Sequence, residues 1–404
     1  MAQAIISRKG GGGGAATLTF DNYGTSGIEY TGATDLSENK AYLAATTVGN
    51  YALFGGGETG NGTSHSGSSS KVDAYNTSLA RITITDLQVP SEYLAATTVG
   101  NYALFGGGYN YVSGSGNIFN NYVNAYNTSL TRSTPTSLSQ SRGFLAATTV
   151  GDYALFGGGN SQSTVDAYNT SLTRSTPTAL SVAMYKLAAT TVGDYALFGG
   201  SSDAGIYLST VDAYNTSLTR STPTSLSVAR GNLAATTVGD YALFGGGCSS
   251  SSIYSSTVDA YNTSLTRSTP TALSVARYDL AATTVGNYAL FGGGYASLVK
   301  PYHSNVVDAY NTSLTRSVLT VLSDGGYGLS ATSVGNYALF GGRYNGYRST
   351  VDVYHLNSKI ISIYPGTKYK LGDMADEATS QTFQEIEVAT PINGYIKVSN
   401  TTIN

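Results

Sequence analysis

Residues Leu145–Gly159 read LAATTVGDYALFGGG, and this stretch decides the fold because the chain repeats it. Copies with few changes begin at Leu43, Leu94, Leu187, Leu233, Leu280 and Leu329, which makes seven in all. Each copy is followed by a loop of its own and then by a second shared stretch, such as STVDAYNTSLTRSTPTAL at Ser163–Leu180. The starts of successive copies lie between 42 residues (Leu145 to Leu187) and 51 residues (Leu43 to Leu94) apart. A period in this range indicates an array of supersecondary units.

Each unit predicts four short antiparallel strands. LAATTV is rich in Thr and Val and ends at Gly-Asp or Gly-Asn, which is a hairpin signal, and YALFGG predicts a second, mostly buried strand. STVDAY is the third strand, NTSL is its turn, and TRSTPTAL is the fourth, whose Pro fits an outer strand. Four-stranded sheets packed radially cover each other's faces. We therefore expect an all-β fold, a seven-bladed β-propeller of four-stranded antiparallel blades with a small C-terminal β extension.

The flanking segments suggest three parts. We expect an N-terminal peptide with a polyglycine tether at 1–14, the propeller at 15–364 and a small β-rich extension at 365–404. Thr17–Ser37 looks like a degraded half-repeat, and the last unit has a candidate outer strand of its own at Lys359–Tyr364. Both are candidates to complete the last blade, and we favour the N-terminal segment, which would close the ring. In the extension, EIEVATPINGYIKVSN is a hairpin candidate.

Composition excludes several classes of function. Only 11% of the residues are charged and the formal net charge is -3, so the chain lacks the basic stripe that nucleic-acid binding needs. Cys248 is the only cysteine, which excludes an intrachain disulfide framework and a cysteine-based metal cluster. No run reaches the roughly 18 apolar residues of a membrane span, and the start MAQAIISRKGGGGG has no apolar core of a secretory signal. We expect no nucleic-acid partner and no membrane insertion.

The repeat resembles the Kelch repeat. A hydrophobic strand ending in Gly-Gly, a variable loop and then V-D-x-Y with a polar turn recur over Leu43–Tyr364. The Gly pairs begin at Gly55, Gly106, Gly157, Gly199, Gly245, Gly292 and Gly341, and the tyrosines are Tyr75, Tyr126, Tyr168, Tyr214, Tyr261, Tyr310 and Tyr354. The sequence departs from the Kelch pattern at the usual Trp, where it has Ser133, Ser175, Ser221, Ser268 or Ser317. The resemblance implies a β-propeller whose outer strands pack differently.

The copies differ on one face of the expected disc. The turns VGN or VGD and NTSL hardly change, whereas the loops between the second and third strands and the residues before the inner strand do. These loops are rich in Tyr, Ser, Gly and Asn, the composition of antibody paratopes, although such loops are also typical of solvated coil. The candidate ligand-binding residues on this variable face are Tyr42, Tyr93, Tyr109, Asn110, Tyr111, Arg142, Phe144, Tyr185, Lys186, Tyr207, Arg230, Asn232, Tyr254, Arg277, Tyr278, Asp279, Tyr295, Tyr302, His303, Tyr344 and Tyr347.

Three polar patterns have structural explanations. The Asp of VDAY recurs, and folding the NTSL turn predicts cross-strand ion pairs of Asp166 with Arg174, Asp212 with Arg220, Asp259 with Arg267 and Asp308 with Arg316. The Asn of NTS, a glycosylation sequon, is read as a turn residue. Arg142, Arg230 and Arg277 share one position before the inner strand, where Lys40 and Met184 also occur. They are either solvated or meet an acidic ligand.

We expect no metal and no cofactor. His65, His303 and His355 come from scattered places, whereas a catalytic metal needs about three rigidly held ligands. Some Kelch propellers are copper radical oxidases, but Cys248 lacks the supporting residues, so that role is not transferred. No glycine-rich loop precedes a helix, which leaves nucleotide binding without support.

The sequence favours a non-enzymatic recognition protein that binds a cell-surface glycan or protein through the variable face. The N-terminus and the ending ATPINGYIKVSN resemble those of phage tail or tail-fibre proteins, which implies a virion attachment protein whose termini contact other tail proteins. One alternative is an intracellular Kelch scaffold for a protein partner. The other is a glycan-active enzyme, which needs paired carboxylates from Glu58, Glu92, Asp203, Asp279 or Asp324. We expect a virion or extracellular location for an attachment protein and a cytoplasmic one otherwise.

Overall fold

The computed structural model describes residues 4–7, 16–21, 28–60, 65–112, 114, 116–203, 205–296, 302–356, 358–363, 368–370 and 385–387. The chain divides into two compact units, one of Tyr30–Tyr354 and one that joins Met1–Glu29 with His355–Asn404. Among the described residues, no helix has the length and apolar character needed to cross a membrane.

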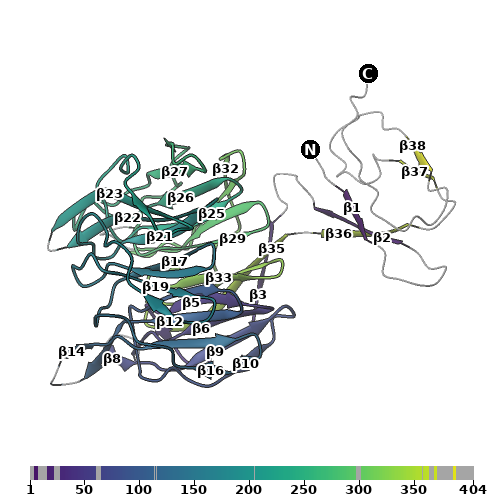
Figure 1. Cartoon of the computed structure of the whole chain (residues 1–404). Coiled ribbons are helices and arrows are strands. Elements are labelled where there is room, and N and C mark those ends of the chain that lie inside the picture. Colours follow the sequence, from purple (N-terminus) through teal and green to yellow (C-terminus); the bar gives the residue numbers. More distant parts are fainter. Residues whose placement is uncertain are drawn as a thin grey trace. The chain divides into compact units, whose positions relative to one another are not determined.

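Seven four-stranded antiparallel sheets form the larger unit, one for each repeat (Figure 1). The third blade consists of β17 (Ala146–Val150), β18 (Tyr153–Gly157), β19 (Val165–Asn169) and β20 (Arg174–Ser175), in that order from the inside outward. The first two blades are β5 (Ala44–Val48), β6 (Tyr51–Gly55), β9 (Val72–Asn76) and β10 (Arg81–Thr83), then β11 (Ala95–Val99), β12 (Tyr102–Gly106), β15 (Val123–Asn127) and β16 (Arg132–Ser133).

The later blades repeat this order. They are β21 (Ala188–Val192), β22 (Tyr195–Asp203), β23 (Ile206–Asn215) and β24 (Arg220–Ser221), then β25 (Ala234–Val238), β26 (Tyr241–Gly245), β27 (Val258–Asn262) and β28 (Arg267–Ser268), then β29 (Ala281–Val285), β30 (Tyr288–Gly292), β31 (Val307–Asn311) and β32 (Arg316–Val318). Small extra sheets from the loops join β4 (Lys40–Ala41), β7 (Glu58–Gly60) and β8 (His65–Ser68), and β13 (Tyr109–Val112) with β14 (Gly116–Phe119).

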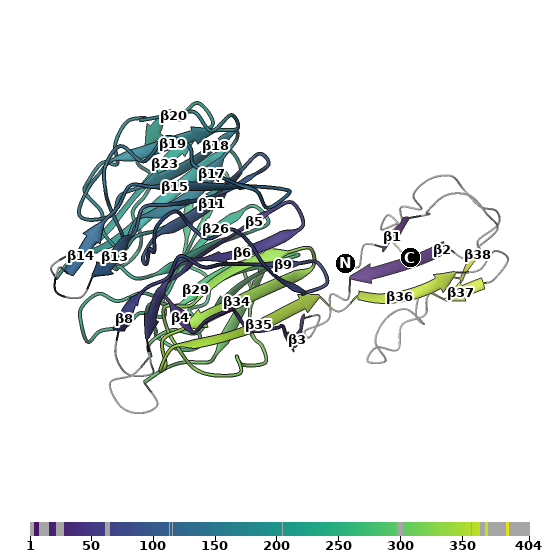
Figure 2. The same ribbon diagram turned by 90° about the horizontal axis from the view of Figure 1, so that it is seen from below.

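The ring of blades is closed. Each inner strand contacts the inner strand of the next blade, and β33 (Ser330–Val334) of the seventh blade contacts β5 of the first. The seventh blade continues outward through β34 (Tyr337–Arg343) and β35 (Arg348–Leu356) and ends with β3 (Ile28–Gly32), which lies beside β35 in Figure 2. Because β3 precedes the first repeat in the sequence, hydrogen bonds of one sheet join the two ends of the ring. The fold is therefore a seven-bladed β-propeller.

The smaller unit takes up the flanking segments. A three-stranded sheet contains β1 (Ala4–Ser7), β2 (Ala16–Asp21) and β36 (Ser358–Ile363), and β37 (Lys368–Lys370) pairs with β38 (Glu385–Glu387). The other candidate for the last outer strand was 359–364; its residues 359–363 lie in β36 and pair with β2 instead, and 364 lies outside the described residues. The polyglycine tether and the rest of the C-terminal hairpin candidate lie outside the described residues.

The outer strand is shorter than the sequence predicts. In place of TRSTPTAL, only Arg174–Ser175 forms β20. The rest of the segment crosses to the next blade, where Leu180 is buried and the carbonyl of Thr178 accepts a hydrogen bond of 2.7 Å from the Tyr214 hydroxyl. The tyrosine of each VDAY or equivalent stretch therefore ties its blade to the preceding segment.

The core lies between neighbouring blades. Phe156 of the third blade and Leu104 of the second belong to one buried cluster, and a side chain at Gly106 would place its Cβ 2.9 Å from the Phe156 ring. The first Gly of each Gly-Gly pair is thus needed for close approach of the next blade. Near the axis, the small inner-strand residues Ala and Thr line a cavity of about 360 Å³, and the hydroxyls of Thr97 and Thr149 lie 2.8 Å apart across two blades.

Candidate functional site

Each repeat places one residue at the axis, directly before the Leu that precedes its inner strand. These seven residues form what we name the axial ring: Tyr42, Tyr93, Phe144, Lys186, Asn232, Asp279 and Gly328. All seven have a positive φ, between 50° at Asp279 and 64° at Gly328. Each backbone N–H donates a hydrogen bond to the carbonyl of the preceding member, and the N–H of Tyr42 closes the ring on the carbonyl of Gly328 at 2.6 Å.

The axial ring combines a constant backbone with different side chains. Left-handed backbone is unfavourable for Tyr, Phe and Lys, and such strain persists where surrounding structure imposes it and is concentrated at functional sites. Here the closed ring of hydrogen bonds imposes it. The side chain at this position differs among blades, whereas the next residue is Leu in all seven. The backbone therefore does not dictate the side chain.

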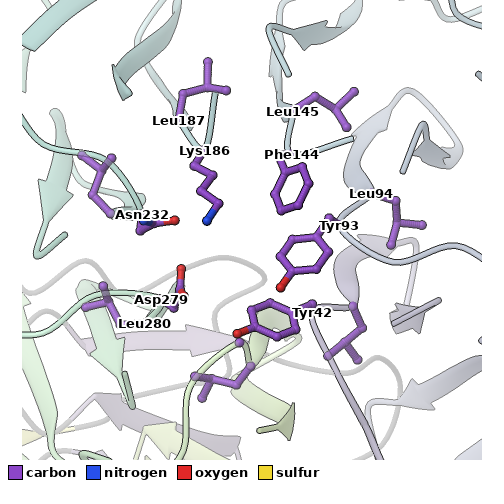
Figure 3. Close-up of a pocket in the computed structure, with 14 residues that line it drawn as sticks. Tyr42, Tyr93, Leu94, Phe144, Leu145, Lys186, Leu187, Asn232, Asp279 and Leu280 are labelled. Carbon is purple, nitrogen blue, oxygen red and sulfur yellow. The ribbon is translucent and has the colours of Figure 1, made fainter. Parts of the chain in front are cut away.

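The axial ring surrounds a pocket with a cavity volume of about 190 Å³. The leucines that follow the ring residues also line it. Figure 3 shows Phe144, Tyr93 and Tyr42 along one side of the pocket and Lys186, Asn232 and Asp279 along the other, with their side chains directed into it. The pocket thus has an aromatic side and a polar side.

The aromatic side is a row of packed rings. The rings of Tyr42 and Tyr93 are stacked with their centroids 4.3 Å apart. The Phe144 centroid lies 4.1 Å from that of Tyr93 and 4.6 Å from that of Tyr185. Burial raises the pKa of both Tyr42 and Tyr93 well above the usual value, so their hydroxyls stay protonated at neutral pH. They can therefore donate as well as accept hydrogen bonds at the edge of the cavity.

The polar side carries opposite charges. Lys186 Nζ lies 5.5 Å from the centroid of Phe144 and 5.6 Å from that of Tyr185, within the range of cation–π interactions. Burial raises the pKa of Asp279 to about 6, although the charge of Lys186 partly opposes this. Among the described residues, none donates a hydrogen bond to the Asp279 carboxylate and no cation lies within ion-pair distance. Asn232, between them in the ring, donates from Nδ2 to Cys248 Sγ at 3.6 Å.

Aromatic contacts continue around the pocket beyond the ring. The ring centroids of Tyr42 and Tyr327 are 6.1 Å apart, and those of Tyr327 and Tyr295 are 5.5 Å apart. The Tyr278 centroid lies 5.3 Å from that of Tyr295 and 5.1 Å from that of Tyr254. We name the whole chain of contacts the aromatic belt: Tyr185, Phe144, Tyr93, Tyr42, Tyr327, Tyr295, Tyr278 and Tyr254. Tyr302 and His303 pack on Tyr295, and Tyr344 packs on Tyr327.

Seven of the eight belt residues were candidate ligand-binding residues, and six candidates belong to the axial ring. Tyr327 and Gly328 were not among the candidates, although they occupy the same pre-strand positions as Tyr278 and Asp279. Gly328 matters for the pocket because a Cβ there would lie 2.8 Å from the Tyr42 ring. Its missing side chain thus makes room for Tyr42. Asn110 and Tyr111, on β13, and Tyr207, on β23, do not line the axial pocket.

The expectation that Arg142, Arg230 and Arg277 face solvent or ligand is wrong. All three side chains are fully buried and form ion pairs of 2.8, 2.8 and 2.9 Å with Asp166, Asp259 and Asp308. The residue three places before the Leu points back into its own blade, because the positive φ of the ring residue turns the chain sharply after it. Sequence spacing gave no sign of that turn.

Tyr109 and Tyr347 are likewise buried, with 7% and 1% of their surfaces exposed. Tyr109 packs between Phe119 and Phe144, and the Tyr347 hydroxyl donates to Glu58. They were expected on the exposed loop surface, but they support that surface from below. A Tyr in a loop packs as a core residue where neighbouring loops cover it.

The predicted cross-strand ion pairs are confirmed. The expected register, with Asp166 directly opposite Arg174, is wrong: Arg174 lies opposite Tyr168 and reaches Asp166 diagonally at 3.6 Å. The pairs of Asp212, Asp259 and Asp308 with Arg220, Arg267 and Arg316 measure 2.9, 2.8 and 2.8 Å. The Asx turn is also present, since Asn169 Oδ1 accepts hydrogen bonds from the backbone N–H groups of Ser171 and Thr173 at 3.0 and 2.9 Å. Within the described ranges, no three His, Cys, Asp or Glu side chains are grouped to hold a metal ion.

The constancy of the opposite face has a structural cause. A side chain at Gly151, in a VGD turn, would place its Cβ 3.1 Å from Thr216 Cγ2, in the NTSL turn of the next blade. These turns are exposed, but contacts between neighbouring blades restrict which residues fit there. Their constant sequence therefore does not show how fast unconstrained surface residues change. The axial ring is the better comparison, because its seven positions share one backbone and still differ.

No protein-family model matches the sequence, and no curated protein sequence matches it. Among solved structures, that of YjhT matches with a TM-score of 0.49 and 11% sequence identity, over 82% of this chain and 99% of YjhT.

Proposed function

We propose that the chain is a recognition protein that binds a cell-surface ligand, without catalysis, through the variable face of the propeller. The observation that carries this proposal is the axial ring. Seven positions with one backbone conformation and one hydrogen-bonding pattern carry Tyr, Phe, Lys, Asn, Asp and Gly side chains, all around one pocket. A fold that needed only stability would have no reason to differ there.

The aromatic belt supplies the contact area that such a role requires. Tyr gives large, rigid and amphipathic contact surface at low entropy cost, as in antibody paratopes. Receptors on a bacterial surface change, so a fixed scaffold with changeable side chains suits a phage tail attachment protein. The terminal segments would then contact other tail proteins. Glycans and proteins both remain within the proposed ligand class.

The test is binding of the purified protein to a panel of bacterial cells and immobilised glycans. The variant Tyr295→Ala/Tyr302→Ala removes two loop aromatics, one of them 37% exposed. The matched control, Asp152→Asn/Asp240→Asn, alters two exposed turns of the opposite face. We expect the loop variant to lose binding with an unchanged melting temperature and the control to retain it. Binding to no envelope or glycan, together with a stable cytoplasmic protein partner in a pull-down, would instead favour a scaffold.

A further inference from the structure

We propose that the axial pocket is the subsite for a single uncharged pyranose ring, in which the Asp279 carboxylate accepts hydrogen bonds from two adjacent hydroxyls. This inference rests on the proposed function and names the ligand class at its centre.

The environment of Asp279 favours a ligand that donates hydrogen bonds. Its carboxylate faces the cavity, is partly removed from water and receives no hydrogen bond from the described residues. A carboxylate accepts about four hydrogen bonds, and a desolvated one without donors is unfavourable. Two neighbouring hydroxyls on a sugar ring present two donors at the spacing of the two carboxylate oxygens. A ligand of this kind would satisfy the group that the protein leaves without a donor.

The charges of the pocket offset each other. Lys186 supplies an ammonium and Asp279 a carboxylate to one cavity of about 190 Å³, so the pocket has no excess of either charge to attract a singly charged ligand. Asn232 adds an amide, and Tyr42 and Tyr93 add phenol groups. The pocket therefore combines donors and acceptors, and the hydroxyl is the group that serves as both.

The apolar lining and the size of the pocket also suit a sugar ring. The leucine floor and the edges of Phe144 and Tyr93 offer apolar surface to the C–H groups of a sugar. The cavity volume of about 190 Å³ gives room for one sugar ring. The pocket would therefore take the terminal sugar of a glycan, and the aromatic belt would contact the sugars that follow.

The experiment is calorimetric titration of the full chain with the methyl pyranosides of mannose, glucose and galactose, and with their singly deoxygenated counterparts. The test variant is Asp279→Asn, and Asp240→Asn makes the same change on an exposed turn of the opposite face. We expect at least one pyranoside to bind, and Asp279→Asn to weaken it about tenfold or more, as the loss of hydrogen bonds to a charged group implies. Asp240→Asn should bind like wild type, and removing one of two adjacent hydroxyls should reproduce the loss.

The outcomes separate the two proposals. If wild type and Asp279→Asn bind cells or glycan arrays equally, the pyranose subsite is overturned while the recognition function stands. The same holds if the pocket binds the zwitterion betaine and no pyranoside. If wild type binds neither cells nor glycans nor pyranosides, both proposals fail. A melting temperature of each variant that is no lower than that of wild type shows that unfolding is not the cause of lost binding.

Discussion

The Asp166 carboxylate and the Arg142 guanidinium form an ion pair of 2.8 Å in which neither side chain is exposed. Equivalent buried pairs join Lys40 with Asp73 at 3.3 Å and Arg230 with Asp259 at 2.8 Å. Each of these Asp residues also forms an ion pair with an Arg of the outer strand. The buried pairs hold the pre-strand segment against its own blade and thereby place the axial ring.

The repeats contain natural replacements of this pair. In the second blade, Asn124 replaces the Asp and Ser91 stands in place of the buried cation, so both charges are absent together. In the fourth blade, Met184 replaces the cation, and among the described residues Asp212 forms an ion pair with the outer-strand Arg220 alone. In the seventh, Gly326 leaves room that Arg343 fills from another strand to reach Asp352. A buried Asp is thus tolerated with one cation, whereas no blade has the buried cation without its Asp.

Asp166→Asn should therefore be more harmful than Arg142→Met. The first change leaves a fully buried guanidinium without its carboxylate, for which we expect a loss of about 3–5 kcal/mol in the free energy of unfolding. The second reproduces the fourth blade and should be clearly less destabilising. The double variant Arg142→Ser/Asp166→Asn reproduces the second blade and should recover much of the loss. Urea unfolding of the three variants checks this, and equal losses for the two single variants would contradict it.

Gly157→Ala should destabilise the interface between the third and fourth blades. The added Cβ would lie 2.7 Å from Phe198 Cε1, closer than carbon atoms approach, and overpacking of this kind costs about 1–3 kcal/mol. The double variant Gly157→Ala/Phe198→Leu should relieve part of the clash, because Leu is smaller than Phe and has no ring. Gly32→Ala is the matched control, because a Cβ there meets nothing within 4 Å. Thermal unfolding that ranks the two single variants equally would argue against this packing.

The fold was predictable because its signals are local and repeated seven times. Strand alternation, the Gly-Asp and Gly-Asn turns and the spacing of Asp166 and Arg174 each act over a few residues. The buried ion pair of Arg142 was not predictable, because it depends on the backbone turn at Phe144. The positive φ of 59° at that residue cannot be predicted from a Phe in the sequence. Burial of Tyr347 depends on contacts with Glu58, 289 residues away. Pattern alone cannot distinguish such a Tyr from an exposed one.

Side chains at the axial ring should be exchangeable within the limits of a positive φ. Lys186→Asn copies the residue of the next blade, and Asn tolerates left-handed backbone better than Lys, so stability should be unchanged or raised by a few tenths of a kcal/mol. Lys186→Val places a β-branched side chain at φ 54° and should cost about 1–2 kcal/mol. Thermal unfolding checks both. If Val is tolerated as well as Asn, the ring does not hold its backbone as described.

Asp279→Asn should stabilise the protein at neutral pH while it weakens ligand binding. Because burial raises the pKa of Asp279 from 3.8 to about 6, the ionised carboxylate is less favourable in the folded chain than in the unfolded one. Above pH 6 this destabilisation is fully present. As the pH falls from 6 towards 3.8, the folded chain takes up a proton before the unfolded chain does, and the destabilisation disappears.

The gain from Asp279→Asn should therefore depend on pH. We expect the free energy of unfolding to rise by about 1–2 kcal/mol at pH 7.5 and by almost nothing at pH 4. The gain is smaller than the full pKa shift implies, because the side chain keeps contact with solvent. Urea unfolding at both pH values measures it, with Asp240→Asn as the control of equal charge. Ligand binding by wild type should weaken as the pH falls below 6, since the protonated acid accepts fewer hydrogen bonds. A gain in stability that is the same at both pH values would show that the carboxylate is not desolvated, and the pocket would then lack the feature that we expect to select its ligand.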